Sequence, residues 1–166
     1  LALATSIRFF KESGVMAVKL EGAHLETVKK LVASGIPVMG HLGLTPQSMH
    51  QLGGYRVQGR TDGDAILEAA LALEAAGAFA IVLELVPAEL ATRITAVLSI
   101  PTIGIGAGVG CDAQVLVWTD MVGLTKNAPK LAKAYRDLRG EILGAAREFA
   151  DDVRSGAFPS EDQTFR

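Results

Sequence analysis

The chain has 166 residues, of which 49% are hydrophobic and 20% are charged, and its formal net charge is −2. This length suffices for one well-buried domain, and the composition is typical of a soluble globular protein. The small net charge, without a cluster of Lys or Arg, disfavours nucleic acid and anionic membranes as partners. The single cysteine, Cys111, excludes a disulfide within these residues and favours a cytoplasmic location. We expect neither a signal peptide nor a membrane span.

Helices and strands alternate along most of the chain. In chain order, the hydrophobic periodicity predicts a helix over 2–12, a strand over 16–21, a helix over 24–34, a strand over 37–42, a helix over 64–76, a strand over 79–85, a helix opened by Pro87, and strands over 100–104 and 114–118. A long helix from about 129 to 153 and a polar tail follow. Thr45 is expected to cap a short helix that begins at Pro46.

This alternation favours right-handed βαβ units and a parallel sheet of five strands. Three successive strands end in an ionisable residue, namely Glu21, His41 and Glu84. Functional groups at the carboxyl ends of parallel strands are typical of a (βα)8 TIM-type barrel, which takes about 250 residues when complete. We therefore expect a single domain over 1–166 that forms the C-terminal, five-stranded part of an incomplete barrel.

Each strand-end residue has a structural and a functional interpretation. Glu84 lies among apolar neighbours, so it is either a carboxylate at the barrel rim or a general base. Lys19 and Glu21 share one face of their strand and form either a simple ion pair or a site for a substrate carboxylate and a hard cation. His41 alone would more often be a structural histidine than a catalytic one.

Two glycine-rich stretches are candidates for ligand binding. The loop over 51–61 is long, polar and without helical or strand periodicity, and such loops are usually functional. The run Gly104-Ile-Gly-Ala-Gly-Val-Gly110 fails the dinucleotide pattern because Val109 stands where a glycine is required. We favour backbone clearance after a strand for this run, although a phosphate cradle is known at this place in barrels.

Five motifs resemble the ketopantoate hydroxymethyltransferase family. They are Val-Lys-Leu-Glu-Gly (18–22), Gly-His-Leu-Gly-Leu-Thr-Pro-Gln-Ser (40–48), Gly-Gly-Tyr-Arg-Val-Gln-Gly-Arg (53–60), Val-Leu-Glu-Leu-Val-Pro (82–87) and Ile-Gly-Ile-Gly-Ala-Gly (103–108). The resemblance implies a barrel of the phosphoenolpyruvate/pyruvate superfamily and a cytoplasmic homo-oligomer, decameric in the family. It also implies Mg²⁺-assisted transfer of a hydroxymethyl group from 5,10-methylenetetrahydrofolate to α-ketoisovalerate, the first step of pantothenate synthesis.

The resemblance also assigns roles to four residues. Glu84 corresponds to the proton acceptor, and His41 lies beside the substrate, so we expect both to be catalytic. Lys19 is expected to bind the keto acid, and Glu21 to belong to the metal site. The family's Asp-Ser pair and second aspartate, which ligate magnesium and substrate, have no counterpart in this chain. We therefore expect these residues alone to be inactive.

Three alternatives remain from the sequence. Another Mg²⁺-dependent keto-acid barrel, such as an isocitrate lyase relative, would need a Lys-Lys-Cys-Gly-His-type loop, which the sequence lacks. A phosphosugar-binding half barrel would need a second glycine anchor after the last strand, where 117–120 reads Val-Trp-Thr-Asp. A non-catalytic assembly module is the third alternative.

Overall fold

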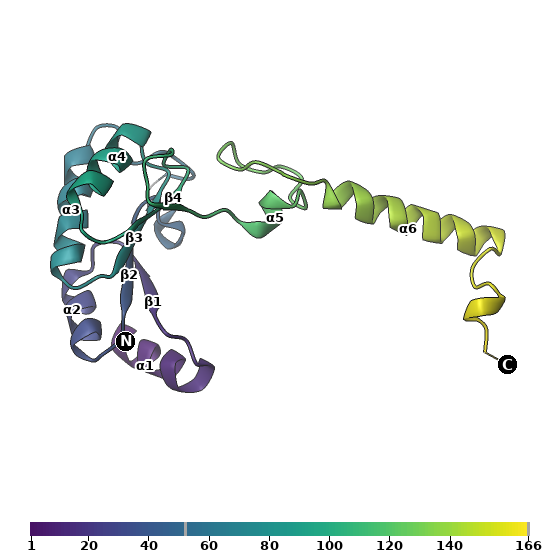
Figure 1. Ribbon diagram of the computed structural model, residues 1–166, viewed down its shortest axis with the longest axis horizontal. Coiled ribbons are helices and arrows are strands. Elements are labelled where there is room, and N and C mark those ends of the chain that lie inside the picture. The colour runs from purple at the N-terminus through teal and green to yellow at the C-terminus, as the bar shows by residue number, and fades with distance from the viewer. Residues whose placement is uncertain (52, 166) are drawn as a thin grey trace. The chain divides into compact units, whose positions relative to one another are not determined.

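The computed structural model describes residues 1–51 and 53–165 and shows helices, strands and connecting loops (Figure 1). The chain divides into two compact units, Leu1–Val115 and Leu116–Arg166. The two units are described separately below, and the single-domain organisation expected for 1–166 stays a prediction. Within the described residues, no helix is both long and apolar enough to cross a membrane.

The first unit contains an open, fully parallel sheet of five strands. The strands are β1 (Val18–Glu21), β2 (Val38–Gly43), β3 (Ala80–Glu84), β4 (Thr102–Ile105) and β5 (Ala113–Gln114). Their order in the sheet is their order in the chain, so each strand pairs with the one before it. This sequential parallel order is that of a (βα)8 barrel, and it confirms the predicted incomplete barrel.

Helices cover one face of this sheet. They are α1 (Ala2–Ser13), α2 (Leu25–Ala33), α3 (Gly63–Ala75) and α4 (Ala88–Val97). In Figure 1, α2, α3 and α4 lie side by side along the strands. Each helix begins and ends within a few residues of the predicted range, because its apolar residues recur at helical spacing toward the sheet.

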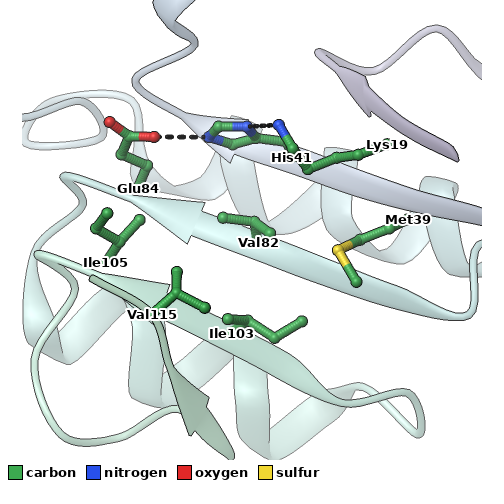
Figure 2. Close-up of a pocket in the computed structure, with 8 residues that line it drawn as sticks. All are labelled: Lys19, Met39, His41, Val82, Glu84, Ile103, Ile105 and Val115. Carbon is green, nitrogen blue, oxygen red and sulfur yellow. Dashed lines mark hydrogen bonds and ion pairs between the residues drawn. The ribbon is translucent and has the colours of Figure 1, made fainter. Parts of the chain in front are cut away.

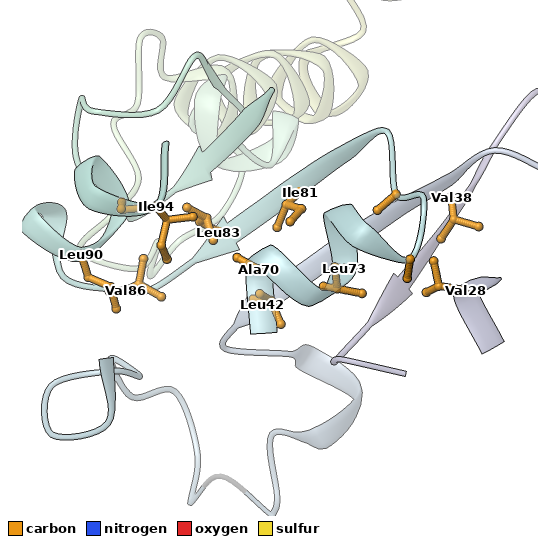
Figure 3. Packing of buried hydrophobic residues seen from close by; sticks show 14 of the residues in the cluster. Val28, Val38, Leu42, Ala70, Leu73, Ile81, Leu83, Val86, Leu90 and Ile94 are labelled. Carbon is orange, nitrogen blue, oxygen red and sulfur yellow. The ribbon is translucent and has the colours of Figure 1, made fainter. Parts of the chain in front are cut away.

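The hydrophobic core lies between these helices and the sheet (Figure 3). Ile81 and Leu83 of β3 are fully buried and meet buried residues of the helices, such as Leu73 and Ile94. Gly40 on β2 shows how close the layers are, because a Cβ there would lie 3.0 Å from Leu73 Cδ1. Side chains alternate along a strand, so the residues between these core positions point to the opposite face.

The predicted strand over 114–118 is wrong beyond its first residue. Strand β5 comprises only Ala113–Gln114, because only these two residues pair with Ile103 and Gly104 of β4. After Val117 the backbone turns into the short helix α5 (Trp118–Met121), in which the Asp120 and Met121 amides bind the Val117 carbonyl. The β-branched and aromatic side chains of this run suggested a strand, but among the described residues its hydrogen bonding to β4 ends with the Val115 amide, which donates to Gly104 O at 3.0 Å.

The second unit contains α5 and the long helix α6 (Leu138–Ser155), which begins about nine residues later than predicted. Asp137 caps α6, since its side chain accepts a hydrogen bond from Gly140 N at 3.0 Å. The backbone before Asp137 is not helical; there the Tyr135 amide donates a hydrogen bond to Met121 O of α5 at 2.8 Å. Large apolar side chains of α6 are solvent-exposed, as Ile142 is at 58%.

Candidate active site

The predicted site residues lie on one face of the sheet, opposite the helices. Parallel pairing sets Glu21 level with His41, and His41 level with Val82. Glu84 lies two residues further along β3 and therefore on the same face as Val82. The strand register thus brings the carboxyl ends of β1, β2 and β3 together, as the sequence predicted.

A cavity of ≈ 360 Å³ lies over this face. Its lining is mainly apolar, with three polar side chains among five apolar ones (Figure 2): Lys19, Met39, His41, Val82, Glu84, Ile103, Ile105 and Val115. A mostly apolar cavity with a few convergent polar groups is typical of a small-molecule site.

His41 lies at the centre of the polar group and contacts both other members. Its Nδ1 is 3.0 Å from Lys19 Nζ, and its Nε2 is 3.1 Å from Glu84 Oε2 (Figure 2). The side chain of His41 is only 3% exposed, and that of Glu84 only 11%. The contact with Glu84 is close but misaligned, so among the described residues Nε2 has no hydrogen-bond partner.

Glu21 is turned from this chain of contacts toward the loop after β2. One carboxylate oxygen accepts a hydrogen bond from Gln47 N at 2.9 Å, and the other lies 3.7 Å from Lys19 Nζ. Gln47 belongs to the short 3-10 helix Pro46–Ser48, which begins at Pro46 as predicted. The predicted cap is wrong, because the Thr45 side chain makes no capping hydrogen bond and Glu21 binds the free amide instead.

The backbone around Glu84 is held tightly. The Leu44 amide donates to Glu84 O at 2.8 Å, and Gly43 has a φ of +88°, at which any Cβ would collide with that same carbonyl. Leu85 has a φ of +47°, which is unusual for a residue other than glycine and costs about 1–3 kcal/mol. Leu85 O accepts from Gln58 N at 2.8 Å.

The polar loop predicted over 51–61 therefore reaches the same end of the sheet as Glu84. Its described residues, 51 and 53–61, form turns and bends without helix or strand, as predicted, and Leu52 lies outside the described residues. Gly59, with a φ of +80°, fits against Leu90 and Ile66, where a Cβ would be 2.7 Å from the Leu90 side chain. The loop thus binds the backbone after Glu84 and packs against side chains of α3 and α4.

The glycine run after β4 provides clearance, as favoured from the sequence. A Cβ at Gly108 would lie 2.5 Å from Ala88 Cβ, and a Cβ at Gly110 would collide with Thr92. Gln114 fixes this loop by donating to Gly108 O at 2.9 Å. The run is therefore required for packing against α4.

Asp112 closes the same loop onto β4. Its carboxylate accepts hydrogen bonds from Thr102 N at 2.8 Å and from the Thr102 hydroxyl at 3.1 Å. These two bonds favour the ionised form and lower the pKa of Asp112 below its usual value. Thr102 is fully buried and also contacts Thr95 of α4, with 2.7 Å between the hydroxyl oxygens.

Comparison with known proteins gives the family. The sequence profile of ketopantoate hydroxymethyltransferase matches residues 1–161. The chain belongs to this family. It is similar to 3-methyl-2-oxobutanoate hydroxymethyltransferases from Acidothermus cellulolyticus (61% identical over 99% of this chain and 62% of the relative), Frankia casuarinae (58%, 99% and 57%) and Acaryochloris marina (59%, 95% and 63%). The chain thus spans less than two thirds of the length of these family members.

A solved structure supports the fold alone. The chain superposes on a protein in the Amycolatopsis orientalis BexX/CysO complex with a TM-score of 0.53 and 16% identity, over 95% of this chain and 65% of that one. At this identity the likeness concerns the α/β architecture and the open parallel sheet.

The resemblance implies magnesium, and the structure tests whether this family member's residues fit it. Mg²⁺ requires near-octahedral oxygen ligands. Among residues 1–51 and 53–165, no group of three or more His, Cys, Asp or Glu side chains could hold a metal ion. Glu21 supplies one carboxylate, of which one oxygen already binds the Gln47 amide. The described residues therefore do not form a magnesium site by themselves.

Sequence reasoning found the polar residues of the site but missed part of its frame. Ile103 and Ile105 line the cavity and were not singled out. Both residues could have been predicted from strand pairing, because β4 pairs with β3 so that Ile103 lies level with Val82 and Ile105 level with Glu84. The contact between Glu21 and the Gln47 amide had no local signal, since it joins residues 26 positions apart.

Proposed function

We propose that the protein transfers a hydroxymethyl group from 5,10-methylenetetrahydrofolate to α-ketoisovalerate. Water supplies the hydroxyl oxygen, and the products are ketopantoate and tetrahydrofolate. Family membership supports this proposal, as do relatives named for the reaction on 3-methyl-2-oxobutanoate. The cytoplasm as its location and a homo-oligomer, decameric as in the family, belong to the same proposal.

The observation that carries the proposal is the setting of Glu84. Its carboxylate is nearly buried at the end of β3 and lines a cavity whose walls are mostly alkyl side chains. Such a carboxylate can accept a proton from carbon, because few water molecules compete for its oxygens. In the proposed reaction Glu84 removes the C3 proton of the keto acid, and the resulting enolate forms a bond to the one-carbon unit of the folate.

Lys19 is proposed to bind the carboxylate of the keto acid. Its side chain is 41% exposed and lines the same cavity as Glu84. An ammonium group has three donors, of which one is used by His41 and another is directed toward Glu21 at 3.7 Å. A third donor is therefore free to bind a substrate anion. Met39, Val82 and Ile103 surround this position with the apolar surface that a branched alkyl group requires.

The test is exchange of the C3 hydrogen of α-ketoisovalerate in deuterated water, followed by NMR. In the intact protein, Glu84→Gln should lower the exchange rate by about 10²-fold or more, the usual scale for loss of a general base. Glu89→Gln, at the first turn of α4, is the matched control and should exchange at the wild-type rate. A Glu84→Gln variant with the wild-type rate would remove Glu84 from this role, and an intact wild-type protein without exchange or ketopantoate formation would refute the function.

For the metal, we propose only that Glu21 contributes one oxygen ligand to Mg²⁺. When bound, magnesium would acidify the C3 proton of the keto acid by withdrawing electrons from its oxygens. The remaining ligands would come from residues outside this chain. Mg²⁺ titration by calorimetry on the intact protein tests this, and Glu21→Gln should weaken binding while Glu26→Gln on α2 should not.

We also propose that residues 1–166 alone do not catalyse the reaction. Strands β1 and β5 each pair with a single strand here, whereas every strand of a closed barrel has two neighbours. The metal ligands are incomplete as well. Purification of a 166-residue species of verified mass, assayed with excess Mg²⁺ and both substrates, should give no ketopantoate. Turnover at the rate of full-length relatives would contradict this.

A further inference from the structure

We propose that His41 is a positioning residue whose Nε2–H is directed at Glu84, and that Lys19 fixes the histidine in this tautomer. The assignment of Glu84 as the base rests on the proposed function, whereas the tautomer does not. The proposal follows from the chain of contacts Lys19–His41–Glu84, which comes from three neighbouring strands (Figure 2).

The first step concerns the nitrogen that faces Lys19. Lys19 Nζ lies 3.0 Å from His41 Nδ1, which is hydrogen-bonding distance. An ammonium group can only donate, so Nδ1 must accept and cannot carry a hydrogen. With Nδ1 accepting, the hydrogen of the ring is on Nε2.

The second step concerns the nitrogen that faces Glu84. Nε2 is 3.1 Å from Glu84 Oε2, within reach of a hydrogen bond but not aligned for one. A buried N–H without a partner is unfavourable, and an ionised carboxylate can only accept. Rotation of the Glu84 side chain toward Nε2 satisfies both groups, and catalytic hydrogen bonds often align only when the substrate is bound. The other tautomer would instead set a lone pair of Nε2 against the carboxylate.

His41 and Glu84 therefore have different roles in the site. His41 does not accept the C3 proton; it restrains the anionic carboxylate of Glu84 and stabilises its charge until the proton arrives. Lys19 acts on Glu84 through the ring, in addition to its proposed contact with the substrate. This explains why a histidine only 3% exposed stands between the two residues.

The tautomer can be read directly by ¹⁵N NMR of the intact protein with labelled histidine, without substrate. We expect His41 to show a hydrogen on Nε2 and none on Nδ1, while His24 and His50 serve as internal references. Lys19→Met, which keeps the length of the side chain but removes the donor, should shift His41 toward a mixture of tautomers. A wild-type His41 with its hydrogen on Nδ1, or on both nitrogens, would overturn the proposal.

Two substitutions then test the link to Glu84. In His41→Gln the amide nitrogen can occupy the place of Nε2, whereas in His41→Asn it reaches only the place of Nδ1. We expect His41→Gln to retain at least about a tenth of the wild-type C3 exchange rate, and His41→Asn to lose about 10–100-fold, the usual scale for an orienting partner. The Michaelis constant for the keto acid should change little in either variant.

The outcomes separate the possible failures. Equal loss of exchange in folded His41→Gln and His41→Asn variants, with folding checked by circular dichroism, would overturn the positioning role. If neither variant folds, the NMR measurement on the wild-type protein still decides the tautomer. Absence of exchange in the wild type would refute the proposed function but leave the tautomer result standing.

Discussion

The two faces of the sheet in the first unit are built from the same strands but have different composition. On the face covered by helices, β3 presents Ile81 and Leu83, both fully buried in the core. On the opposite face the same strand presents Val82 and Glu84, which line the cavity. A shift of one residue therefore separates a packing position from a candidate catalytic one.

This difference shows how one strand can serve both packing and chemistry. The covered face supplies close packing, as the 3.0 Å approach expected of a Cβ at Gly40 to Leu73 illustrates. The cavity face brings its polar groups close to one another, with 3.0 Å between Lys19 Nζ and His41 Nδ1 and 3.1 Å between His41 Nε2 and Glu84 Oε2. We therefore expect substitutions on the covered face to change the free energy of unfolding, and those on the cavity face to change kinetic constants.

The largest effect is expected on the covered face. Leu73 of α3 is fully buried, whereas Leu71 on the same helix is 39% exposed. Leu73→Ala should lower the free energy of unfolding by about 2–5 kcal/mol, because it removes buried methyl groups and leaves a cavity. Leu71→Ala should change it by about 0.5 kcal/mol. Urea unfolding of both variants checks this, and equal losses would show that the assumed core packing is wrong.

A smaller effect is expected for Lys19 on the cavity face. Lys19→Ala removes a charge-assisted hydrogen bond, generally worth about 1.5–3 kcal/mol, so the Michaelis constant for the keto acid should rise about 10–100-fold. The constant for methylenetetrahydrofolate should change much less. Lys29→Ala on α2, where the side chain pairs with Glu26 at the surface, is the control and should alter neither constant. A parallel rise of both constants after Lys19→Ala would make the residue structural.

The smallest effect concerns Asp112, which binds a polar residue on the covered face. Hydrogen bonds from Thr102 lower the pKa of Asp112 in the folded protein. The resulting stabilisation is present above the ordinary aspartate pKa of about 4 and is lost as the pH falls through the lower folded-state value. Asp112→Asn should therefore destabilise the protein at pH 7, and its difference from wild type should shrink in acid.

Denaturant unfolding at several pH values measures this difference. Asp64→Asn is the matched control, since Asp64 is exposed and pairs with Arg93 at the surface. Its difference from wild type should stay near zero at every pH. A difference for Asp112→Asn that does not depend on pH would contradict the assigned hydrogen bonds.

The first unit could be predicted from the sequence to a large extent. Strands β1 to β4 and helices α1 to α4 were identified because hydrophobic periodicity and flanking glycines agree there with the tertiary structure. The grouping of Lys19, His41 and Glu84 followed from strand alternation and parallel order. Strand alternation predicts the face on which a side chain lies but not which atom its end contacts. The contact between Lys19 Nζ and His41 Nδ1 therefore could not be predicted.

The second unit was predicted less well. Residues 129–137 have helix-compatible spacing, but Asp137 begins the helix by binding Gly140 N, and the Tyr135 amide binds the Met121 carbonyl of α5. The run after β5 has the composition of a strand and lacks a partner for one. In both places long-range hydrogen bonding decides between local conformations that the sequence leaves nearly equal.

Leu85 has a consequence for engineering. Its left-handed backbone joins the carboxyl end of β3 to β4 and to the polar loop, because its amide donates to Ile105 O and its carbonyl accepts from Gln58 N. A stabilisation programme that scans for strained residues would select Leu85→Gly, since glycine adopts a φ of +47° without the steric penalty. Glycine would also give the backbone beside Glu84 more conformational freedom, so thermostability and turnover should be measured together for this substitution.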